Sequence, residues 1–566
     1  MRVPGIVRVG VALLVAAQVL AASPGMALAA RGESQPTVIA TLPVGVGEGR
    51  VGVETTPEGS WGVSAFAISG DGRFWLVDGV NDKLVVLAPD GALQREIPLP
   101  GPLVCPEDIA VTDDSVYLLD VSAQPAVLVR LDRESGALES THDLPVRYAA
   151  FAVTGMSVVD GRGPQDDVFL EVDDTWAIPF LQKGAAVPAV DLPLVRRENR
   201  VDVEAEHAAE YAVRDARGHG YAVRLDGDGH SGGVNVYDSG RKLSRLNVRT
   251  AGRLGTLRAL SAAVSDRSYV AVEEVPSPGQ VRSFIESFDA SGNADAAYRV
   301  PTERFAWYPK RGLRVSGGGD VYCLVPTREG ITIERLPAET TAALAASPVV
   351  DSPASDKPSL LSRIRAGLSD ALRTVRRVLT PSPAYGAWTR LNASDRASDY
   401  LSNSWYCTAS NYSRSCGDTR PRYITASGKT YGSVPYCWGG FDTASTFNTA
   451  MSNSKDAGDI NTTGSKRSCT AGVDCSGFVS RLWGLGSKYS TNTLLNVSYA
   501  VNPDSMTGSD LWDYPDNHAI AHRYYTSSGV AAVWESTKTD QADRVVARTR
   551  TTSELSGYKP RRFYQW

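Results

Sequence analysis

Cys475 has the clearest position for chemistry in this chain of 566 residues. It is the second residue of the stretch Asp-Cys-Ser-Gly-Phe-Val at positions 474–479, where a turn is expected to lead into a helix. The amides and aligned peptide dipoles at a helix N-terminus favour a thiolate over a thiol. Cys475 is therefore a candidate nucleophile, and the alternative is half of a disulfide bond.

Two downstream residues could activate this thiol. His518 opens the stretch His-Ala-Ile-Ala-His after a loop-like segment, as the first residue of a strand would. Neutral imidazole is the usual base for a thiol. Glu535 lies in an apolar strand expected at 531–537, where its carboxylate could orient the imidazole. His522 is a rival base about 13 Å further along the strand, and we expect it to be a solvated or capping side chain.

An upstream segment, residues 435–440, reads Pro-Tyr-Cys-Trp-Gly-Gly and could line a cleft. The order Tyr-x-Trp-Gly-Gly, Asp-Cys-Ser-Gly-Phe-Val, strand-borne His and a further polar residue resembles the NlpC-type cysteine peptidases of bacterial cell walls. The resemblance covers about the last third of the chain. It implies a papain-like α+β fold and cleavage of peptidoglycan stem peptides, commonly between D-glutamate and the following diamino acid.

The same resemblance assigns roles to individual residues. It makes Cys475 the nucleophile, His518 the base and Glu535 the third catalytic residue, a position where the family usually has His, Asn or Gln. It implies substrate contacts for Tyr436, Trp438, Asp474 and Ser476. The chain departs from the family in the long gap between Gly440 and Asp474, whose polar composition is typical of a surface loop.

The seven cysteines lie at positions 105, 323, 407, 416, 437, 469 and 475. An odd number leaves at least one thiol unpaired. Two local disulfides, Cys407 with Cys416 and Cys437 with Cys469, would leave Cys475 free. Cys105 and Cys323 could pair or remain buried thiols. No Cys-x-x-Cys spacing indicates a metal site, and neither a metal nor an organic cofactor is expected.

The N-terminus is typical of a secretory signal peptide over residues 1–29. Arg2 and Arg8 precede an apolar run at 9–20, and Ala-Leu-Ala at 27–29 offers a cleavage site. The run is too short for a confident membrane anchor. We therefore expect a secreted or extracytoplasmic protein, in the cell wall or periplasm, with no transmembrane segment in the mature chain.

Residues 35–345 are predicted to form an all-β propeller of about six blades. A pattern of three strands separated by Gly/Asp turns recurs with a period of roughly 40 residues, most clearly at 64–91 and 108–136, with echoes near 284–292 and 316–322. The strand expected at 38–42 could close the ring against the last blade. The alternative is an irregular pair of β-sandwiches.

Residues 346–384 form the expected linker, with a basic amphipathic helix within 360–379. This helix could pack on a neighbouring domain, lie on an anionic membrane surface or cover the active site. Residues 385–566 then form the α+β peptidase domain.

The sequence thus predicts a multidomain, secreted peptidoglycan hydrolase whose propeller binds a protein or a polymer. The alternatives are a cysteine amidase or acyltransferase of the same fold, and a propeller-based binding protein with a vestigial catalytic domain. The net charge of −5 and the small basic excess after residue 380 do not indicate nucleic acid binding.

Overall fold

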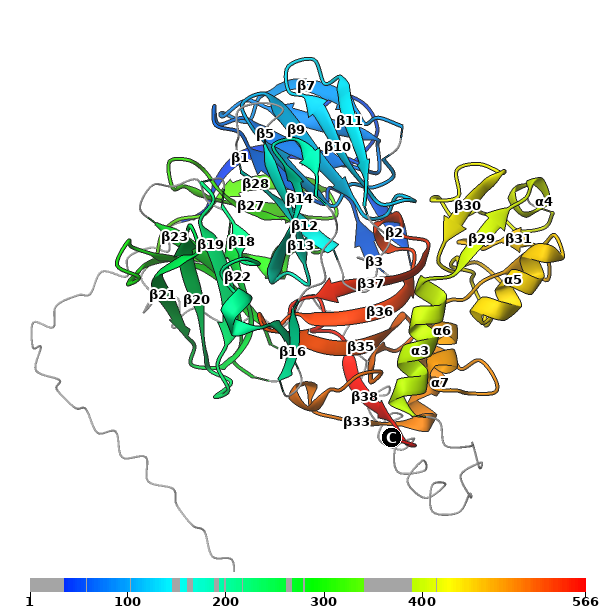
Figure 1. Cartoon of the computed structure of the whole chain (residues 1–566). Helices are drawn as coiled ribbons and strands as arrows, with labels where there is room; N and C mark the ends of the chain where they lie inside the picture. Colours follow the sequence, from blue (N-terminus) through cyan, green and yellow to red (C-terminus); the bar gives the residue numbers. More distant parts are fainter. Residues whose placement is uncertain are drawn as a thin grey trace, which may run out of the picture. The chain divides into compact units, whose positions relative to one another are not determined.

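Six four-stranded antiparallel sheets make up the described N-terminal region of this protein, whose structure is a computed structural model (Figure 1). The structure describes residues 35–566 except 57–58, 102, 145–152, 160–165, 188–192, 198–199, 216, 261–266, 278–279, 340–388 and 414. The signal peptide predicted at 1–29 and the linker helix predicted within 346–384 lie outside the described residues.

The sheets follow one another along the chain. The first two contain β4 (Phe66–Ile68), β5 (Phe74–Asp78), β6 (Lys83–Leu87) and β7 (Leu93–Pro98), then β8 (Asp108–Val111), β9 (Ser115–Asp120), β10 (Val127–Asp132) and β11 (Leu138–Asp143). The next two contain β12 (Val153–Val159), β13 (Asp167–Val172), β14 (Trp176–Gln182) and β15 (Ala185–Ala186), then β18 (Val213–Arg214), β19 (Gly220–Leu225), β20 (Ser231–Asp238) and β21 (Arg241–Arg249). The fifth contains β22 (Arg253–Leu260), β23 (Ser268–Val275), β24 (Arg282–Phe288) and β25 (Ala294–Arg299).

The sixth sheet joins the two ends of this region. It contains β26 (Leu313–Val315), β27 (Val321–Pro326) and β28 (Gly330–Arg335), and β1 (Thr37–Pro43) completes it by pairing antiparallel with β28. The closing strand predicted at 38–42 is confirmed. A separate hairpin is formed by β2 (Glu54–Thr56) and β3 (Gly59–Trp61).

Neighbouring sheets share hydrophobic cores all the way round. On β5, Trp75 packs in a cluster with Leu118 of β9, whereas Phe74 packs in a cluster with Leu324 of β27. Because successive side chains of a strand point to opposite faces, one strand serves two adjacent sheets. Similar clusters join the remaining neighbours. The ring of shared cores confirms the propeller of about six blades, and the sandwich alternative is wrong.

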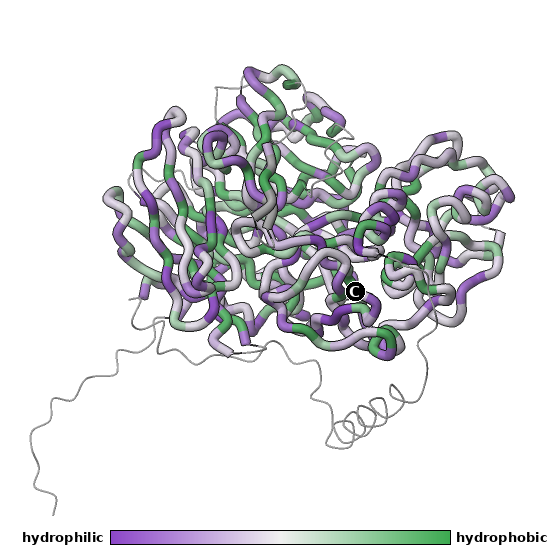
Figure 2. The backbone as a smooth tube through the Cα atoms, turned by 60° about the horizontal axis from the view of Figure 1, so that its bottom comes forward, coloured by the Kyte–Doolittle hydropathy of each residue, from purple (hydrophilic) through white to green (hydrophobic). Residues whose placement is uncertain are grey.

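Outer strands show the period of two expected for a half-buried sheet. On β21, Leu246 and Val248 are buried while Arg245 and Asn247 are exposed, and Figure 2 shows hydrophobic and hydrophilic residues mixed along these strands. Each fully buried large apolar side chain contributes roughly 1.5–3 kcal/mol. Burial of alternate side chains thus attaches this outer strand to the ring.

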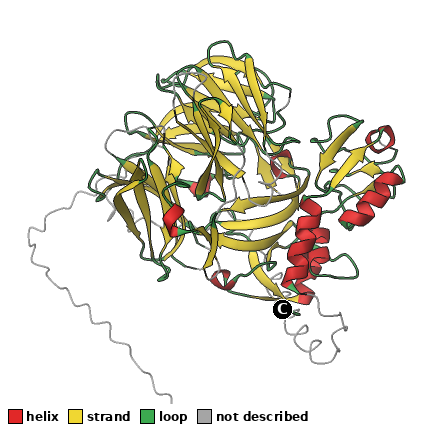
Figure 3. Ribbon diagram, viewed as in Figure 1, coloured by secondary structure: helices red, strands yellow, loops and turns green. Residues whose placement is uncertain are grey.

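The C-terminal region combines helices with one antiparallel sheet (Figure 3). Its helices are α3 (Arg390–Leu401), α4 (Ala409–Tyr412), α5 (Ala444–Ser452), α6 (Cys475–Leu482) and α7 (Thr491–Leu494). Its sheet has the order β33 (Ser498–Ala500), β38 (Lys559–Phe563), β34 (Leu511–Tyr514), β35 (His518–Thr526), β36 (Ala531–Thr537) and β37 (Arg544–Arg550). Two short pairs, β29 (Ser404–Cys407) with β30 (Lys429–Gly432) and β31 (Asp456–Ala457) with β32 (Thr470–Ala471), complete it. Helix α6 packs on β35 and β36, with α3 beside it.

The propeller and the C-terminal region belong to one compact unit, residues 36–566. A propeller segment supplies β16 (Leu194–Arg197) and β17 (Arg200–Val203), and β17 pairs parallel with β35. The amides of Leu225 and Leu257 donate to the carbonyl oxygens of Ser527 and Ser528. The guanidinium of Arg544 donates to two carbonyl oxygens of the propeller, at positions 121 and 122. Because these bonds use buried backbone groups, the two regions are packed together rather than merely linked.

The disulfide pairing differs from both predicted pairs. Cys416 is bonded to Cys469, across a sequence separation of 53, whereas Cys407 and Cys437 are free and buried. The cause is local: Asp456 accepts hydrogen bonds from the amides of Ser415, Cys416 and Gly417, and it is the first residue of the short pair that ends near Cys469. Cys105 and Cys323 are free buried thiols.

None of the helices in the described ranges is both long and apolar enough to span a bilayer.

Candidate active site

Helix α6 begins at Cys475 because Asp474 caps it. The Asp474 backbone is extended (φ −93°, ψ −179°), and its carboxylate accepts a hydrogen bond of 2.7 Å from the amide of Gly477. The helix ends where Gly484 takes a φ of +68°. The helix start predicted at Cys475 is confirmed, and Asp474, which was expected only to contact substrate, is the residue that caps it.

The two motifs upstream and at Cys475 pack against each other. The amide of Gly439 donates to the Asp474 carboxylate at 2.9 Å, and Tyr436 forms a β-bridge with Val473. A Cβ atom on Gly477 would lie 2.1 Å from the carbonyl oxygen of Gly440, so only glycine permits this approach. Contact between the two motifs is thus built into their glycines.

The predicted substrate-binding residues differ in exposure. Tyr436 is fully buried, whereas Trp438 is half-buried and donates from its indole to the carbonyl oxygen of Gly464. Asp474 and Ser476 are buried, and Lys488 lies 3.0 Å from the Asp474 carboxylate and 3.3 Å from the Ser476 hydroxyl. Burial raises the pKa of Asp474, although Lys488 opposes this. Their contacts with substrate stay predictions.

The long segment between the two motifs is more than the surface loop expected from its composition. It contains α5, whose Phe447 is fully buried in the same hydrophobic cluster as Cys475, and the disulfide to Cys416. A Thr443 cap begins this helix. Short polar side chains in the segment are thus used for capping, and buried side chains such as Phe447 and Met451 anchor it.

His518 and Glu535 form a buried pair. The imidazole Nε2 lies 2.7 Å from the Glu535 carboxylate, and both residues are almost completely buried. The other carboxylate oxygen contacts Arg550 at 2.7 Å and Arg548 at 3.1 Å. Burial opposes ionisation of Glu535, but Arg550, Arg548 and His518 together hold its pKa well below the usual range. Glu535 is therefore close enough to orient the imidazole of His518.

Cys475 and this pair lie on opposite faces of the sheet. Ala519 and Ala521 belong to the hydrophobic cluster that contains Cys475, whereas Ile520 belongs to another cluster. The pairing of β34 with β35 is regular from His518 onward, so the side chain of His518 projects on the side of Ile520. We call the α6 side the thiol face and the other the carboxylate face. A proton transfer between Cys475 and His518 stays a prediction.

Asp513 is a functional candidate that the sequence analysis missed. It pairs directly with Ala519, which places it on the thiol face. It is fully buried, and among the described residues neither carboxylate oxygen has a hydrogen-bond partner. Burial raises its pKa to about 7. A charged residue between Trp512 and Tyr514, inside an otherwise apolar strand, was the available signal.

His522 is not the solvated or capping side chain that was expected. It is fully buried, its Nδ1 accepts from the indole of Trp512 at 3.4 Å, and burial lowers its pKa to about 3. It is a neutral core residue on the carboxylate face.

The other free thiols are poor nucleophiles. Burial raises the pKa of Cys407 and of Cys437 to about 11, and it raises the pKa of Cys105 and Cys323 as well. At neutral pH these four remain protonated. Of the cysteines outside the disulfide, Cys475 is the one at the start of a helix.

A chain of ion pairs connects the carboxylate face with the propeller. Lys310 lies 3.7 Å from Asp540, Asp540 lies 2.9 Å from Arg548, and Arg548 contacts Glu535, which holds His518. The side chains of this chain are mostly buried, so their charges are weakly screened. The propeller therefore contributes to the electrostatic environment of His518.

Potential metal ligands gather elsewhere. In the described part of the chain, one group of acidic and histidine side chains, Glu204, Glu206 and His207, has ligand atoms within 4.8 Å of one another. It is largely exposed and shares no element with α6 or β35. Nothing in its surroundings indicates an ion.

No protein-family model and no curated protein matches the chain. Among solved structures it is similar to a member of the DUF4221 family from Bacteroides vulgatus, at 9% identity over 51% of this chain and 99% of that chain, with a TM-score of 0.30. A streptogramin B lyase gives 10% identity, coverages of 52% and 97% and a TM-score of 0.30. A virginiamycin B lyase from Staphylococcus aureus gives 13%, 51% and 86%, and 0.28. At such scores the propeller rests on its own strand pairing.

Proposed function

We propose that this protein is a secreted cysteine hydrolase of the NlpC type that cleaves amide bonds in peptidoglycan stem peptides. The bond from D-glutamate to the following diamino acid is the first candidate. The observation that carries the proposal is the position of Cys475, the first residue of a capped helix packed on an antiparallel sheet. A papain-like fold would place its nucleophile in this way, and the two motifs of the resemblance pack together here.

The reaction would begin when the Cys475 thiolate attacks the amide carbonyl carbon. The backbone amides at the start of α6, including that of Cys475, would stabilise the resulting oxyanion. Protonation releases the amine, and water then hydrolyses the thioester. The chemistry of this scheme needs no cofactor.

Two groups compete for the role of base. His518 is held by Glu535 but projects from the carboxylate face, so it would act only if the start of β35 turned its imidazole towards α6. The turn before it contains Asp516 at a φ of +64°, a strained conformation for a residue other than glycine. Asp513 already lies on the thiol face, and with a pKa of about 7 it can exchange a proton near neutral pH.

A second function is favoured by one observation. Cys475 is 4% exposed and His518 is 2% exposed, so the proposed catalytic groups are closed to a polymer in this conformation. A propeller-based binding protein with a vestigial catalytic region would tolerate such closure. Binding of a protein or a wall polymer by the propeller is part of both proposals.

The test is digestion of purified peptidoglycan by the mature chain, with released fragments identified by mass spectrometry. Cys475→Ala should reduce release at least about a thousandfold, as removal of a covalent nucleophile does. Cys407→Ala is the matched control, because it removes a protonated buried thiol at the end of β29 and should leave release unchanged.

Two further variants separate the bases. If His518 is the base, His518→Ala should lose activity and Asp513→Asn should keep the pH profile of the parent. If Asp513 is the base, His518→Ala should stay active and Asp513→Asn should change the pH profile. Absence of fragments with the folded parent protein, together with tight binding to the same polymer, would replace the hydrolase by the binding protein.

A further inference from the structure

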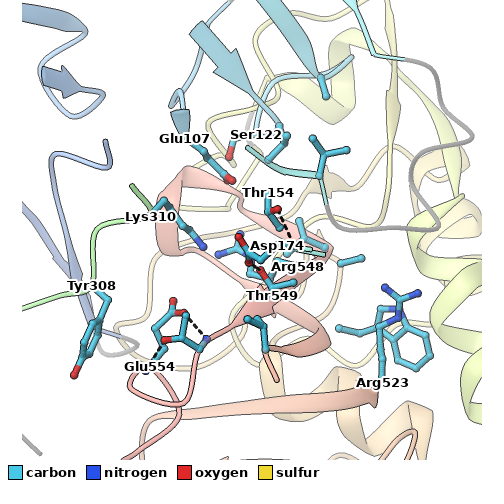
Figure 4. Close-up of a pocket in the computed structure, with 18 of the residues that line it drawn as sticks. Glu107, Ser122, Thr154, Asp174, Tyr308, Lys310, Arg523, Arg548, Thr549 and Glu554 are labelled. Carbon is cyan, nitrogen blue, oxygen red and sulfur yellow. Dashed lines mark hydrogen bonds between the residues drawn. The ribbon is translucent and has the colours of Figure 1, made fainter. Parts of the chain in front are cut away.

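A cavity of about 850 Å³ lies between the propeller and the C-terminal region (Figure 4). Its wall combines propeller residues such as Glu107, Arg258 and Lys310 with Arg548 and Thr549 of β37. This volume is in the range of small-molecule sites in proteins. The cavity is separate from the start of α6, because Cys475 is not among its lining residues.

Two cations of the wall have little opposing charge. The guanidinium of Arg258 makes one long hydrogen bond of 3.4 Å, to the backbone oxygen of Lys310, and among the described residues no carboxylate lies within ion-pair distance of it. The ammonium of Lys310 lies 3.7 Å from the Asp540 carboxylate, a loose pair. Burial lowers the pKa of Arg258 and the neighbouring Arg311 adds to this, whereas Asp174 and Glu171 oppose it from longer range. An anionic group in the cavity would lower the free-energy cost of holding the Arg258 and Lys310 charges there.

Glu107 contributes a carboxylate to the wall of the cavity. Glu107 is only 6% exposed, and within the described part of the chain its carboxylate has no hydrogen bond or ion pair. Burial raises the pKa of Glu107, while Lys310 and Arg548 oppose this. A buried carboxylate without partners is costly unless a ligand supplies a donor.

The rest of the wall contains large apolar side chains from both regions, among them Phe284, Phe305 and Trp534. A ligand complementary to the cavity wall would therefore carry one anionic group, one cationic group and an apolar body. Short peptides and amino acids with apolar side chains have this combination.

We propose that this cavity is a binding site for a small zwitterion of the peptide or amino-acid class. Its carboxylate is received by Arg258 and Lys310, its amino group by Glu107, and its apolar side chain by the aromatic wall. None of these residues belongs to α6, and Lys310 is linked to His518 through the chain of ion pairs that begins at Asp540.

The experiment uses isothermal titration calorimetry on the full mature chain carrying Cys475→Ala, so that hydrolysis cannot remove the probe. The probes are alanyl-phenylalanine, its N-acetyl form and its C-terminal amide. The free dipeptide should bind about tenfold more tightly than either blocked form, since each blocked form leaves one buried charge unpaired.

Variants assign the two ends of the ligand. Arg258→Met should bind the acid and the amide equally, and Glu107→Gln should bind the free and the acetylated amine equally. Arg245→Met is the matched control, because Arg245 is exposed on β21 and pairs with Asp226. Arg258→Met should unfold no earlier than the parent, since it removes a half-buried cation without an ion pair.

Three results overturn the proposal: no binding of any probe to the folded chain, equal binding of the three probes, or unchanged selectivity in both cavity variants. Binding of acetate with the same affinity as the dipeptide would also overturn it, by showing a simple anion site. None of these results bears on whether Cys475 cleaves peptidoglycan.

Discussion

The two faces of the C-terminal sheet treat their carboxylates in opposite ways. On the carboxylate face, Glu535 touches His518, Arg548 and Arg550, which hold its pKa well below the usual range. On the thiol face, Asp513 has no hydrogen-bond partner among the described residues and titrates near pH 7. Asp513 is on β34 and Glu535 is on β36 of the same sheet, and both side chains are fully buried. What differs is direct contact: two arginines touch the Glu535 carboxylate, whereas Arg561 and Lys559 act on Asp513 only at longer range and do not offset its burial.

Removing the Glu535 carboxylate should have the largest effect on stability. Glu535→Ala leaves Arg548 and Arg550 buried without their shared partner, and the free energy of unfolding should fall by about 3–5 kcal/mol. Urea denaturation measures it. Glu535→Gln keeps the shape and one hydrogen bond and should lose less. A fall below about 1 kcal/mol in Glu535→Ala would mean that solvent reaches the arginines.

Asp513→Asn should have an effect that depends on pH. The Asp513 carboxyl has a pKa of about 7 in the folded state and near 4 in the unfolded chain, so its ionisation costs nothing below pH 4. The cost grows as the pH rises from about 4 to 7 and is constant above that. The variant should gain at most roughly 4 kcal/mol over the parent at pH 8, at about 1.36 kcal/mol per pKa unit, and nothing at pH 4.

Thermal unfolding at pH 4, 6 and 8 gives the difference between the two proteins. If this difference is the same at all three values, Asp513 is not titrating in the folded protein, and its candidacy as a base ends.

Ser536→Ala should sharpen the comparison with the smallest change. Ser536 adjoins Glu535 but points to the other face, where its hydroxyl donates to the carbonyl oxygen of Val473 at 2.7 Å. The expected loss of stability is about 1 kcal/mol. Because Val473 precedes the cap of α6, the rate of Cys475 alkylation by iodoacetamide should change in Ser536→Ala and not in Glu535→Gln. Equal rates in both would show that the faces are not separate.

Repetition made the propeller predictable from sequence. The strands at 64–87 and 108–130, the Gly/Asp turns between them and the closing strand at 38–42 all have local signatures, because short apolar runs bounded by turn residues are read directly from the sequence. The cap and the helix start at Cys475 are local as well, since Asp474 acts on an amide three residues away.

Long-range choices could not be predicted in this way. Cys416 is bonded to Cys469 rather than to the nearby Cys407, because Asp456 accepts a hydrogen bond from the Cys416 amide and orders the backbone there. His522 was expected at a wet strand end and is instead buried beside Trp512. Each outcome depends on which distant segments pack on the residue, and the sequence next to the residue does not specify them.

The sequence by itself determined the elements and their chemistry: a cysteine at a capped helix start, a histidine opening a strand, and a ring of repeated strands. These follow from local hydrogen bonding and from side-chain periodicity. Only the tertiary structure decided which face of the sheet each group occupies, because a strand places alternate residues on opposite sides and the packing of α6 selects one side. It also decided the cavity, whose charges come from segments that meet only when the two regions pack together.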